Sequence, residues 1–346
     1  MATTWIVLSI LLVISLLIPL IRSQYWIVKA LEYPMLQQLG ITVFLLVTGL
    51  VIFQNPPLII IILLILLIVG FIYQIYKILP YTSAFHPEMK SNTENTGSIP
   101  ISIYVSNVYQ YNTQYQKTLD QIRKYKPDFI VLLETNKKWA DQLNSLRSEY
   151  YSIEQPQENT YGMLFYSKYK IEEQDVHFLI KNDIPSIEAI IHLGNEKKIK
   201  FWIIHPEPPF PGESDDTEKK DKELIQVAGK IRNENLPAIV AGDLNDVAWS
   251  KTTLLFKKLS NMIDPRIGRG FYNTFHAKNP FIRFPLDHIF FSTEFKLVKL
   301  ERGTNTGSDH FPLFIQTSFN GLHKNDQHSE DILEEDKAEI QEIMQK

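Results

Sequence analysis

Three long apolar runs at the start of the chain constrain its fold more than any other feature. They cover Trp5–Ile21, Leu39–Phe53 and Leu58–Leu79. The last is long enough to cross a bilayer, whose core needs roughly 20 apolar residues, and the first two contain no charged residue. The tight break Asn55-Pro56-Pro57 predicts a helical hairpin between the second and third runs. We therefore predict three membrane spans in residues 1–79.

These apolar runs have two other interpretations. The first run has no basic segment before it, so it is not typical of a cleaved signal peptide. A buried helix of a soluble protein stays the alternative for the shortest run. With three spans, the loop from Arg22 to Gln38 and everything after residue 79 share one side of the membrane. Arg22, Lys29 and Lys77 favour the cytoplasm for that side, opposed by Glu32, which leaves the orientation open.

The charge of the chain is unevenly distributed around a net value of -4. Residues 1–97 carry four Lys and Arg against three Asp and Glu, residues 98–319 carry 28 of each, and residues 320–346 carry three against eight. A neutral central part lacks the basic stripe that usually accompanies tight nucleic-acid binding. The chain contains no cysteine, which excludes disulfides, thiolate metal sites and a cysteine nucleophile.

Two polar segments flank this central part. Residues 80–98 are rich in Ser, Thr, Asn and Pro without periodicity, which predicts a flexible linker. Residues 320–346 form an acidic tail with sparse apolar positions, which predicts either a frayed end or a short surface helix.

Residues 99–319 alternate between short apolar runs typical of strands and amphipathic stripes typical of helices. Helices are predicted from about Thr113, around Trp139–Tyr150, at Leu224–Ile231 and at Thr253–Leu259. The predicted strands are 99–105, 129–133, 162–167, 187–192, 200–204, 238–241, 286–291, 295–300 and 312–319. The pattern predicts a domain that contains both strands and helices.

Polar side chains recur where these predicted strands end. The run from Ala238 to Ala241 stops at Gly242, after which Asp243 and Asn245 occupy alternate positions and are expected to face the same way. Taken singly, such residues are most often turn residues or points where a strand meets water. Asp287 is the hardest to dismiss, because a carboxylate among apolar strand residues is costly unless it is paired.

Together, these residues resemble the endonuclease/exonuclease/phosphatase superfamily, which includes pancreatic-type deoxyribonucleases, abasic-site endonucleases, neutral sphingomyelinases and inositol polyphosphate phosphatases. The resemblance covers residues 98–319 and implies a four-layer α/β sandwich of the deoxyribonuclease type, preceded here by transmembrane helices. The residues that carry it are Asn107, Glu134, His205, Asp243 with Asn245, Asp287, and Ser308-Asp309-His310.

The same resemblance implies a role for each of these residues. Glu134, assisted by Asn107 and with Asp309 nearby, would hold Mg²⁺, or alternatively Mn²⁺, through the oxygen ligands that such a cation prefers. Asp243 would orient or deprotonate the attacking water, and Asn245 would bind phosphate oxygens. His310 would contact the phosphoryl group, Asp287 would orient His310, and His205 would be a second imidazole at the phosphate.

The substrate is less constrained than the chemistry. His205-Pro-Glu-Pro-Pro209 and the segment from Phe281 to Ile289 are similar to the membrane-bound VanJ-like branch, which implies hydrolysis of polyprenyl pyrophosphates outside the cell. Arg283, with Phe281 and Phe284, would then meet a lipid head group, although ordinary packing beside a strand fits these residues equally. We therefore predict a membrane-anchored, Mg²⁺-dependent phosphohydrolase acting on a lipid phosphate or pyrophosphate, with the bilayer as its partner and nucleic acid disfavoured.

Two alternatives stay open. One is a sphingomyelinase-like or nucleic-acid phosphodiesterase, and the other is a membrane-tethered binding module without turnover.

Overall fold

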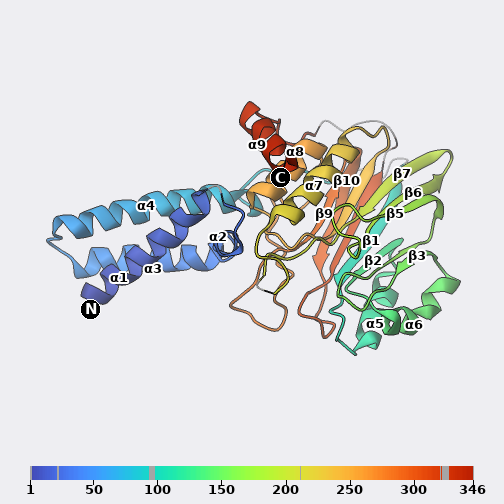
Figure 1. Cartoon of the computed structure of the whole chain (residues 1–346), viewed down its shortest axis with the longest axis horizontal. Helices are drawn as coiled ribbons and strands as arrows, with labels where there is room; N and C mark the ends of the chain where they lie inside the picture. Colours follow the sequence, from blue (N-terminus) through green and yellow to red (C-terminus); the bar gives the residue numbers. More distant parts are fainter. Residues whose placement is uncertain are drawn as a thin grey trace.

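Three apolar helices form the N-terminal part of the chain and project from one side of the rest (Figure 1). The computed structural model describes residues 2–21, 23–92, 98–210, 212–319, 321 and 327–345. The segments Ala2–Leu20, Met35–Ile52 and Leu58–Tyr81 are each long and apolar enough to cross a membrane, as the sequence predicts. The elements are α1 (Ala2–Leu17), η1 (Ile18–Leu20), α2 (Trp26–Ala30), α3 (Met35–Ile52), α4 (Leu58–Ile78) and η2 (Leu79–Tyr81).

Close contacts hold these helices together on their inner faces, while their outer faces stay apolar and exposed. The Trp5 indole donates from Nε1 to the carbonyl of Leu45 at 3.0 Å. Gly49 makes room for that ring, because a Cβ there would lie 2.6 Å from it. Large side chains such as Phe44 and Leu58 point outward with nothing covering them. The acyl chains of a bilayer would cover these apolar side chains, whereas their exposure to water is unfavourable.

The rest of the chain is built around two mixed β-sheets. One has the strand order β10-β11-β1-β2-β4-β3 and the other β5-β6-β7-β8-β9. The first contains β1 (Ile99–Asn107), β2 (Phe129–Leu133), β3 (Tyr151–Gln155), β4 (Met163–Ser167), β10 (Phe295–Arg302) and β11 (Leu313–Phe319). The second contains β5 (Lys170–His177), β6 (Ser186–Gly194), β7 (Lys197–Ile203), β8 (Ala238–Asp243) and β9 (Asp287–Phe291).

The two sheets pack face to face, and helices cover their outer faces, which gives four layers. Alternate residues of the central strands, such as Val131 and Phe201, meet in the apolar layer between the sheets. On the outer face of the first sheet lie α5 (Tyr115–Tyr125), α6 (Lys137–Gln142) and η3 (Asn144–Ser148), and on that of the second lie α7 (Glu218–Arg232) and α8 (Lys251–Ser260). The predicted α/β sandwich is therefore confirmed (Figure 1).

Two strands have no counterpart in the prediction. β3 and β5 lie at the edges of their sheets, and β5 is mostly solvent-exposed and rich in charged residues. Charged side chains are common on edge strands because they discourage pairing with other molecules. An edge strand of this kind lacks the apolar run or clean alternation by which strands are recognised in sequence.

The predicted flexible linker is wrong for its first part, because residues 80–92 pack against the sandwich. Tyr81 is buried and donates to the Ala248 carbonyl at 2.6 Å, and the partly buried Glu88 pairs with buried Lys257 at 2.9 Å. Residues 93–97 lie outside the described part of the chain.

In the acidic tail, α9 (Glu334–Gln345) docks on α7 and α8 through Ile343, so the short surface helix is the correct alternative there. Residues 320, 322–326 and 346 of that tail lie outside the described ranges, as does Arg22 of the orientation argument.

Candidate active site

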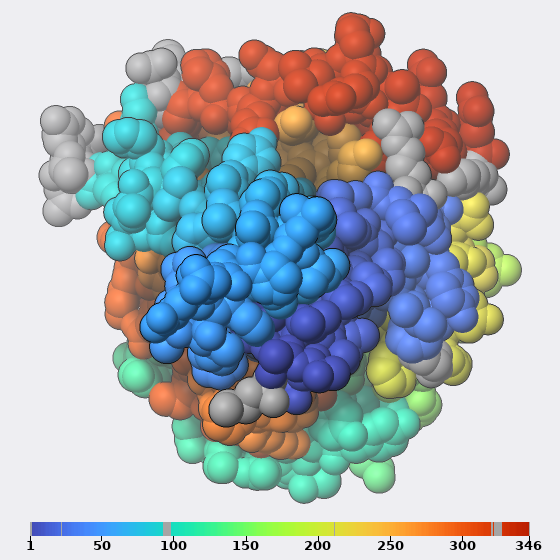
Figure 2. Space-filling view, turned by 90° about the vertical axis from the view of Figure 1, so that its left-hand side faces the viewer, coloured from blue at the N-terminus to red at the C-terminus, as the bar shows by residue number. Residues whose placement is uncertain are grey.

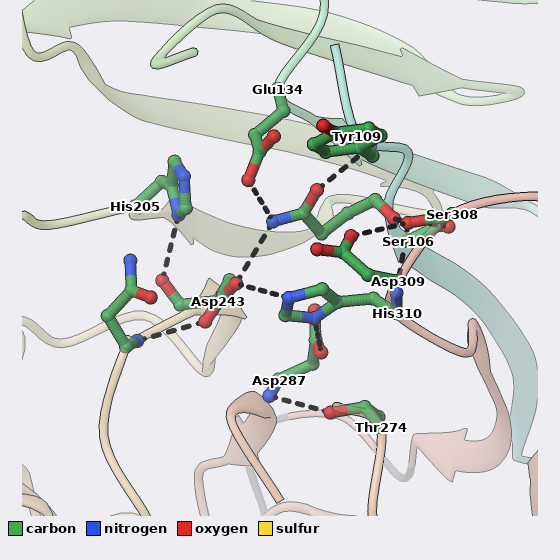
Figure 3. Close-up of polar contacts among 12 residues, drawn as sticks. Ser106, Tyr109, Glu134, His205, Asp243, Thr274, Asp287, Ser308, Asp309 and His310 are labelled. Carbon is green, nitrogen blue, oxygen red and sulfur yellow. Dashed lines mark hydrogen bonds and ion pairs between the residues drawn. The ribbon is translucent and has the colours of Figure 1, made fainter. Parts of the chain in front are cut away.

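The strand-end residues of the two sheets meet at one end of the sandwich (Figure 3). β1 and β2 are parallel, so Asn107 and Glu134 leave the first sheet at the same edge. In the second sheet, Asp243 at the end of β8 lies opposite Asp287 at the start of β9. The loop before β11 brings His310 between them, with its ring near both carboxylates. Tertiary packing thus joins residues that are far apart in the sequence.

Gly242 permits the close approach of β7 and β8 at this end. A Cβ on Gly242 would lie 1.9 Å from the Ile204 carbonyl oxygen, so no other residue fits without moving the backbone. His205 follows β7 and contacts the Asp243 carbonyl through Nδ1 at 3.1 Å. Since a carbonyl only accepts, Nδ1 carries the hydrogen, and a neutral His205 keeps its lone pair on Nε2.

Asp243 is buried and accepts hydrogen bonds on both oxygens. Oδ1 accepts from the Asn245 backbone N–H at 2.9 Å, and Oδ2 accepts from Asn107 Nδ2 at 3.0 Å. Oδ2 also lies 3.5 Å from Nε2 of His310. Each of these contacts favours the ionised carboxylate.

The expectation that Asp243 and Asn245 emerge side by side from one strand is wrong. β8 ends at Asp243, and Asn245 has a φ of 49°, in the left-handed region. The two residues form a turn in which the carboxylate caps the backbone two positions on, as Asp often does. Asn245 instead donates from Nδ2 to the Pro206 carbonyl at 2.9 Å, which leaves one N–H of its amide for another acceptor.

His310 forms a close ion pair with Asp287. Its Nδ1 lies 2.7 Å from Oδ2 of Asp287. Burial by itself would lower the pKa of His310, but the carboxylates of Asp287 and Asp243 outweigh it and raise that pKa to about 10. Burial also opposes ionisation of Asp243, yet the nearby His310 and His205 lower the pKa of that carboxyl below its usual value. At neutral pH the site therefore holds an imidazolium beside an ionised aspartate.

A second carboxylate, Glu134, lies on the other side of Asn107. Asn107 Nδ2 donates to Oε1 of Glu134 at 2.7 Å as well as to Asp243. The Asn107 oxygen accepts from the Tyr109 backbone N–H at 3.0 Å. Glu134 and Tyr109 both have left-handed φ angles, 57° and 59°, which non-glycine residues adopt at a cost and often at functional sites. Burial raises the pKa of Glu134, only partly offset by His205 and Asn107.

Buried acidic and imidazole groups of the site are close enough to hold a metal ion. Within the described part of the chain, one such set is Asp243, Asp287 and His310, whose ligand atoms lie within 4.8 Å of one another. This set differs from the predicted Glu134, Asn107 and Asp309. The ligand roles of those three residues stay a prediction, and Asn107 in this conformation turns its nitrogen rather than its oxygen toward the carboxylates.

Asp309 and Arg283 lie at the edge of this constellation. Oδ1 of Asp309 is 3.3 Å from the Ser308 hydroxyl, which also donates to the Asn107 carbonyl at 2.8 Å and so ties the loop before β11 to β1. The Arg283 guanidinium stacks over the Phe311 ring, 5.2 Å from its centroid, and no described contact joins it to the other site residues. Its role in substrate binding stays a prediction.

A buried network behind Asp287 is not among the features predicted from the sequence. Arg266 donates to the Asp264 carboxylate from Nε and from Nη2. Its Nη2 also donates to Nδ1 of His288 at 2.6 Å. Burial, with Arg266 nearby, lowers the pKa of His288 to about 3, so His288 is neutral and donates from Nε2 to the Asp246 carbonyl at 2.9 Å. Thr274 accepts the Asp287 backbone N–H at 3.2 Å. The adjacency of His288 to Asp287 was the only sequence signal of this network.

Comparison with known proteins identifies this arrangement. The sequence profile of the Endonuclease/Exonuclease/phosphatase family matches residues 105–310, more than half of the chain, including all the strand-end residues from Asn107 to His310. The chain belongs to the endonuclease/exonuclease/phosphatase family. Its central domain is accordingly a phosphoesterase domain of that family, with apolar helices attached at its N-terminus. A search of curated proteins found no match.

Solved structures share the fold at low sequence identity. Zebrafish (D. rerio) TDP2 complexed with a single-stranded DNA product superposes with a TM-score of 0.52 at 17% identity, covering 63% of this chain and 98% of that one. A family member from Bacteroides thetaiotaomicron gives 0.52 at 18% identity over 65% and 99%. The human Nocturnin catalytic domain with bound sulfate gives 0.52 at 16% identity over 65% and 97%. These similarities establish the fold of the central domain.

Proposed function

We propose that this protein is a membrane-anchored, divalent-metal-dependent phosphohydrolase that cleaves a phosphate ester or pyrophosphate of a lipid or lipid-linked substrate. The observation that carries the proposal is a direct contact between the apolar helices and the site. Tyr33, just before α3, donates from its hydroxyl to the Asn245 carbonyl at 2.6 Å. The site turn therefore lies at the end of the helix bundle.

Further contacts support the same placement. The Trp249 indole donates to the Glu32 carbonyl at 2.8 Å, which secures the segment after Asn245. The loop after His205 is also tied to the bundle, because Thr217 donates its backbone N–H to the Gln24 carbonyl at 2.9 Å. If the helices span a bilayer, the Asn245 turn and the loop after His205 both lie next to the bilayer surface. A phosphate at the level of the lipid head groups is then the substrate group within easiest reach.

The donor set fits a divalent cation. Glu134 is partly buried and Asp243 is buried, and both carboxylates accept from the single neutral amide of Asn107. The His310 imidazolium lies beside Asp243 and Asp287, so the negative charge that a divalent cation would balance lies on the Glu134 side of the site. Asp287 is already paired with His310, so we propose that Glu134, with Asp309 and Asn107, is the principal ligand of Mg²⁺. The bound ion would polarise the phosphoryl oxygen and neutralise developing charge.

The residues of the chain would divide the remaining work. Ionised Asp243, held by Asn107 and the Asn245 backbone, positions a water for attack. The His310 imidazolium stabilises charge on a non-bridging oxygen, and Asp287 fixes its orientation. Preorganised charge of this kind is usually the largest contribution to phosphoryl-transfer catalysis.

The similarity of residues 205–209 and 281–289 to the VanJ-like branch supports a polyprenyl pyrophosphate as substrate. The main competitor is a nucleic-acid phosphodiesterase, favoured by the fold shared with TDP2 complexed with a DNA product. Balanced charge in residues 98–319, with 28 residues of each sign, argues against it. A binding module without turnover is the remaining alternative.

The test is an assay of the full chain in detergent-free liposomes with three substrates: polyprenyl pyrophosphate, sphingomyelin and plasmid DNA. Each is offered with Mg²⁺ and with EDTA. We expect release of inorganic phosphate from the polyprenyl pyrophosphate that EDTA abolishes. Cleavage of DNA alone would overturn the lipid proposal, and absence of metal-dependent turnover on all three would favour the binding module.

A further inference from the structure

The loop of residues 276–283 carries large apolar side chains that are exposed on the surface of the protein. Phe281 is 82% exposed and Ile282 is 47% exposed. The base of the loop is nevertheless ordered, because Phe275 donates its N–H to the Phe284 carbonyl at 3.0 Å and their rings stack. A defined loop with an apolar tip is typical of a surface that meets an apolar partner.

The tip of this loop lies where α3 would enter a bilayer. Gln37, in the first turn of α3, donates from Nε2 to the Phe281 carbonyl at 2.9 Å. α3 has 18 residues. At about 1.5 Å per residue, such a helix is about 27 Å long, slightly less than the roughly 30 Å of a hydrocarbon core. A spanning α3 therefore needs its full length to cross the hydrocarbon core. Gln37, in its first turn, must then lie at the membrane boundary together with the loop tip.

The views of the molecule agree with this placement. In Figure 2, which looks along the helices toward the sandwich, orange surface lies directly beside the blue helices on the face turned to the viewer. In Figure 1 an orange loop extends from the sandwich toward the left, about as far as α2. The loop thus extends from the sandwich toward the same boundary as the helices.

The other end of the loop borders the active site. Ala277 donates its N–H to the Asp309 carbonyl at 2.6 Å. The Lys278 ammonium lies 5.5 Å from the ring centroid of Tyr109, whose backbone N–H binds Asn107. The loop therefore bridges the membrane boundary and the mouth of the site.

Cationic side chains lie next to the apolar tip. Arg283 and Arg302 stack on the same Phe311 ring, at 5.2 and 4.4 Å from its centroid. Within the described residues, no carboxylate forms an ion pair with either arginine or with Lys278, and Nε of Arg283 is buried without a hydrogen-bond partner. Two adjacent guanidinium groups without an acid are complementary to phosphate.

We propose that residues 276–283 form an interfacial loop that inserts Phe281 and Ile282 into the boundary between head groups and acyl chains of a bilayer containing anionic lipid. Lys278, Arg283 and Arg302 face the lipid phosphates. Aromatic and aliphatic tips flanked by basic residues bind such surfaces by combining apolar burial with electrostatic attraction. The loop holds the mouth of the site against the head groups.

The absence of native cysteine allows a direct depth measurement. Phe281→Cys is spin-labelled in the full chain, reconstituted in vesicles of phosphatidylcholine and phosphatidylglycerol. Collision rates with oxygen, which concentrates in the bilayer, and with a water-soluble nickel chelate report depth. The matched control is Tyr151→Cys on the edge strand β3, also exposed and far from the helices. We expect an oxygen-to-nickel ratio several-fold higher at 281 than at 151, and equal ratios would overturn the proposal.

A second comparison tests the head-group contacts. In the labelled Phe281→Cys background, Arg283→Gln with Arg302→Gln should reduce the depth of the label in anionic vesicles but not in pure phosphatidylcholine. Lys117→Gln with Lys124→Gln on α5 removes the same charge elsewhere and should leave the depth unchanged. Equal effects of the two pairs would refute the role of the arginines. The proposal rests on the membrane anchoring in the proposed function, but none of these readouts requires turnover, so failure of the proposed hydrolysis would leave them interpretable.

Discussion

Glu223 provides a sharp test of the electrostatics of the sandwich. It lies on α7 with a buried side chain, and its Oε1 accepts from the Ser186 hydroxyl at 2.7 Å. Burial raises the pKa of Glu223 to about 7, against a usual value of 4.5. The folded protein therefore keeps this proton between pH 4.5 and 7, where the unfolded chain has lost it.

The sign of the effect follows from proton linkage. Where the folded state binds more protons than the unfolded state, stability falls as pH rises. The contribution of Glu223 is fully present below pH 4.5 and is lost as pH rises through 7. The gap between about 7 and 4.5, at about 1.4 kcal/mol per pH unit, corresponds to a loss of about 3 kcal/mol by pH 8.

Glu223→Gln should remove this loss, because an amide keeps the acceptor for Ser186 without a charge. At pH 8 we expect the variant to be more stable by up to about 3 kcal/mol, or roughly 6–12 °C in melting temperature for a domain of this size. At pH 5 the two proteins should melt within a few degrees of each other. Tryptophan fluorescence of the full chain in detergent measures both values.

Glu149→Gln is the control, since Glu149 is exposed and should show no effect at either pH. A shift for Glu223→Gln that is equal at pH 5 and pH 8, or a destabilisation at pH 8, would refute the reasoning.

Three further predictions concern the site and its support. Asp243→Asn should lower phosphate release by about 10²-fold or more while the melting temperature stays near that of the wild type, because the shape of the side chain is retained and its charge is lost; full activity would mean that the site is misplaced. Gly242→Ala should destabilise the protein by more than about 2 kcal/mol in chemical denaturation because of its collision with Ile204, whereas Gly229→Ala, which meets nothing within 4 Å on α7, should be neutral or stabilising. Arg266→Met should cost about 3–5 kcal/mol by stranding buried Asp264, and adding Asp264→Asn should recover part of that loss if the ion pair is the cause.

The strands that carry the site were recognisable because each is a buried apolar run ending in a polar residue. Phe129–Leu133 before Glu134 and Ala238–Ala241 before Asp243 are examples, and both strands lie where predicted. β5 is absent from the prediction because an edge strand needs no apolar face of its own. The predicted flexible linker does not hold at Tyr81 and Met89, because both are buried by partners distant in sequence, which local composition cannot reveal.

Within the site, sequence order indicated which side chains take part but not how they are bonded. Asn245 was expected to continue the alternation of β8, yet its left-handed backbone turns the amide toward Pro206. The pairing of His310 with Asp287 was implied by family resemblance, whereas the sharing of Asn107 between Glu134 and Asp243 is visible only in the folded chain.

The sequence by itself determined the membership in the family, the α/β character of the central domain and the presence of three helices able to span a membrane. Periodicity and run length are local properties of the chain. The order of the motifs is read along the chain without knowing which residues meet in space. Only the tertiary structure decided that the helix bundle ends against the mouth of the site. That arrangement rests on contacts such as Tyr33 with Asn245, which are separated by 212 positions. No local pattern encodes a contact at such a separation, because it depends on how the complete surfaces of the bundle and the sandwich fit together.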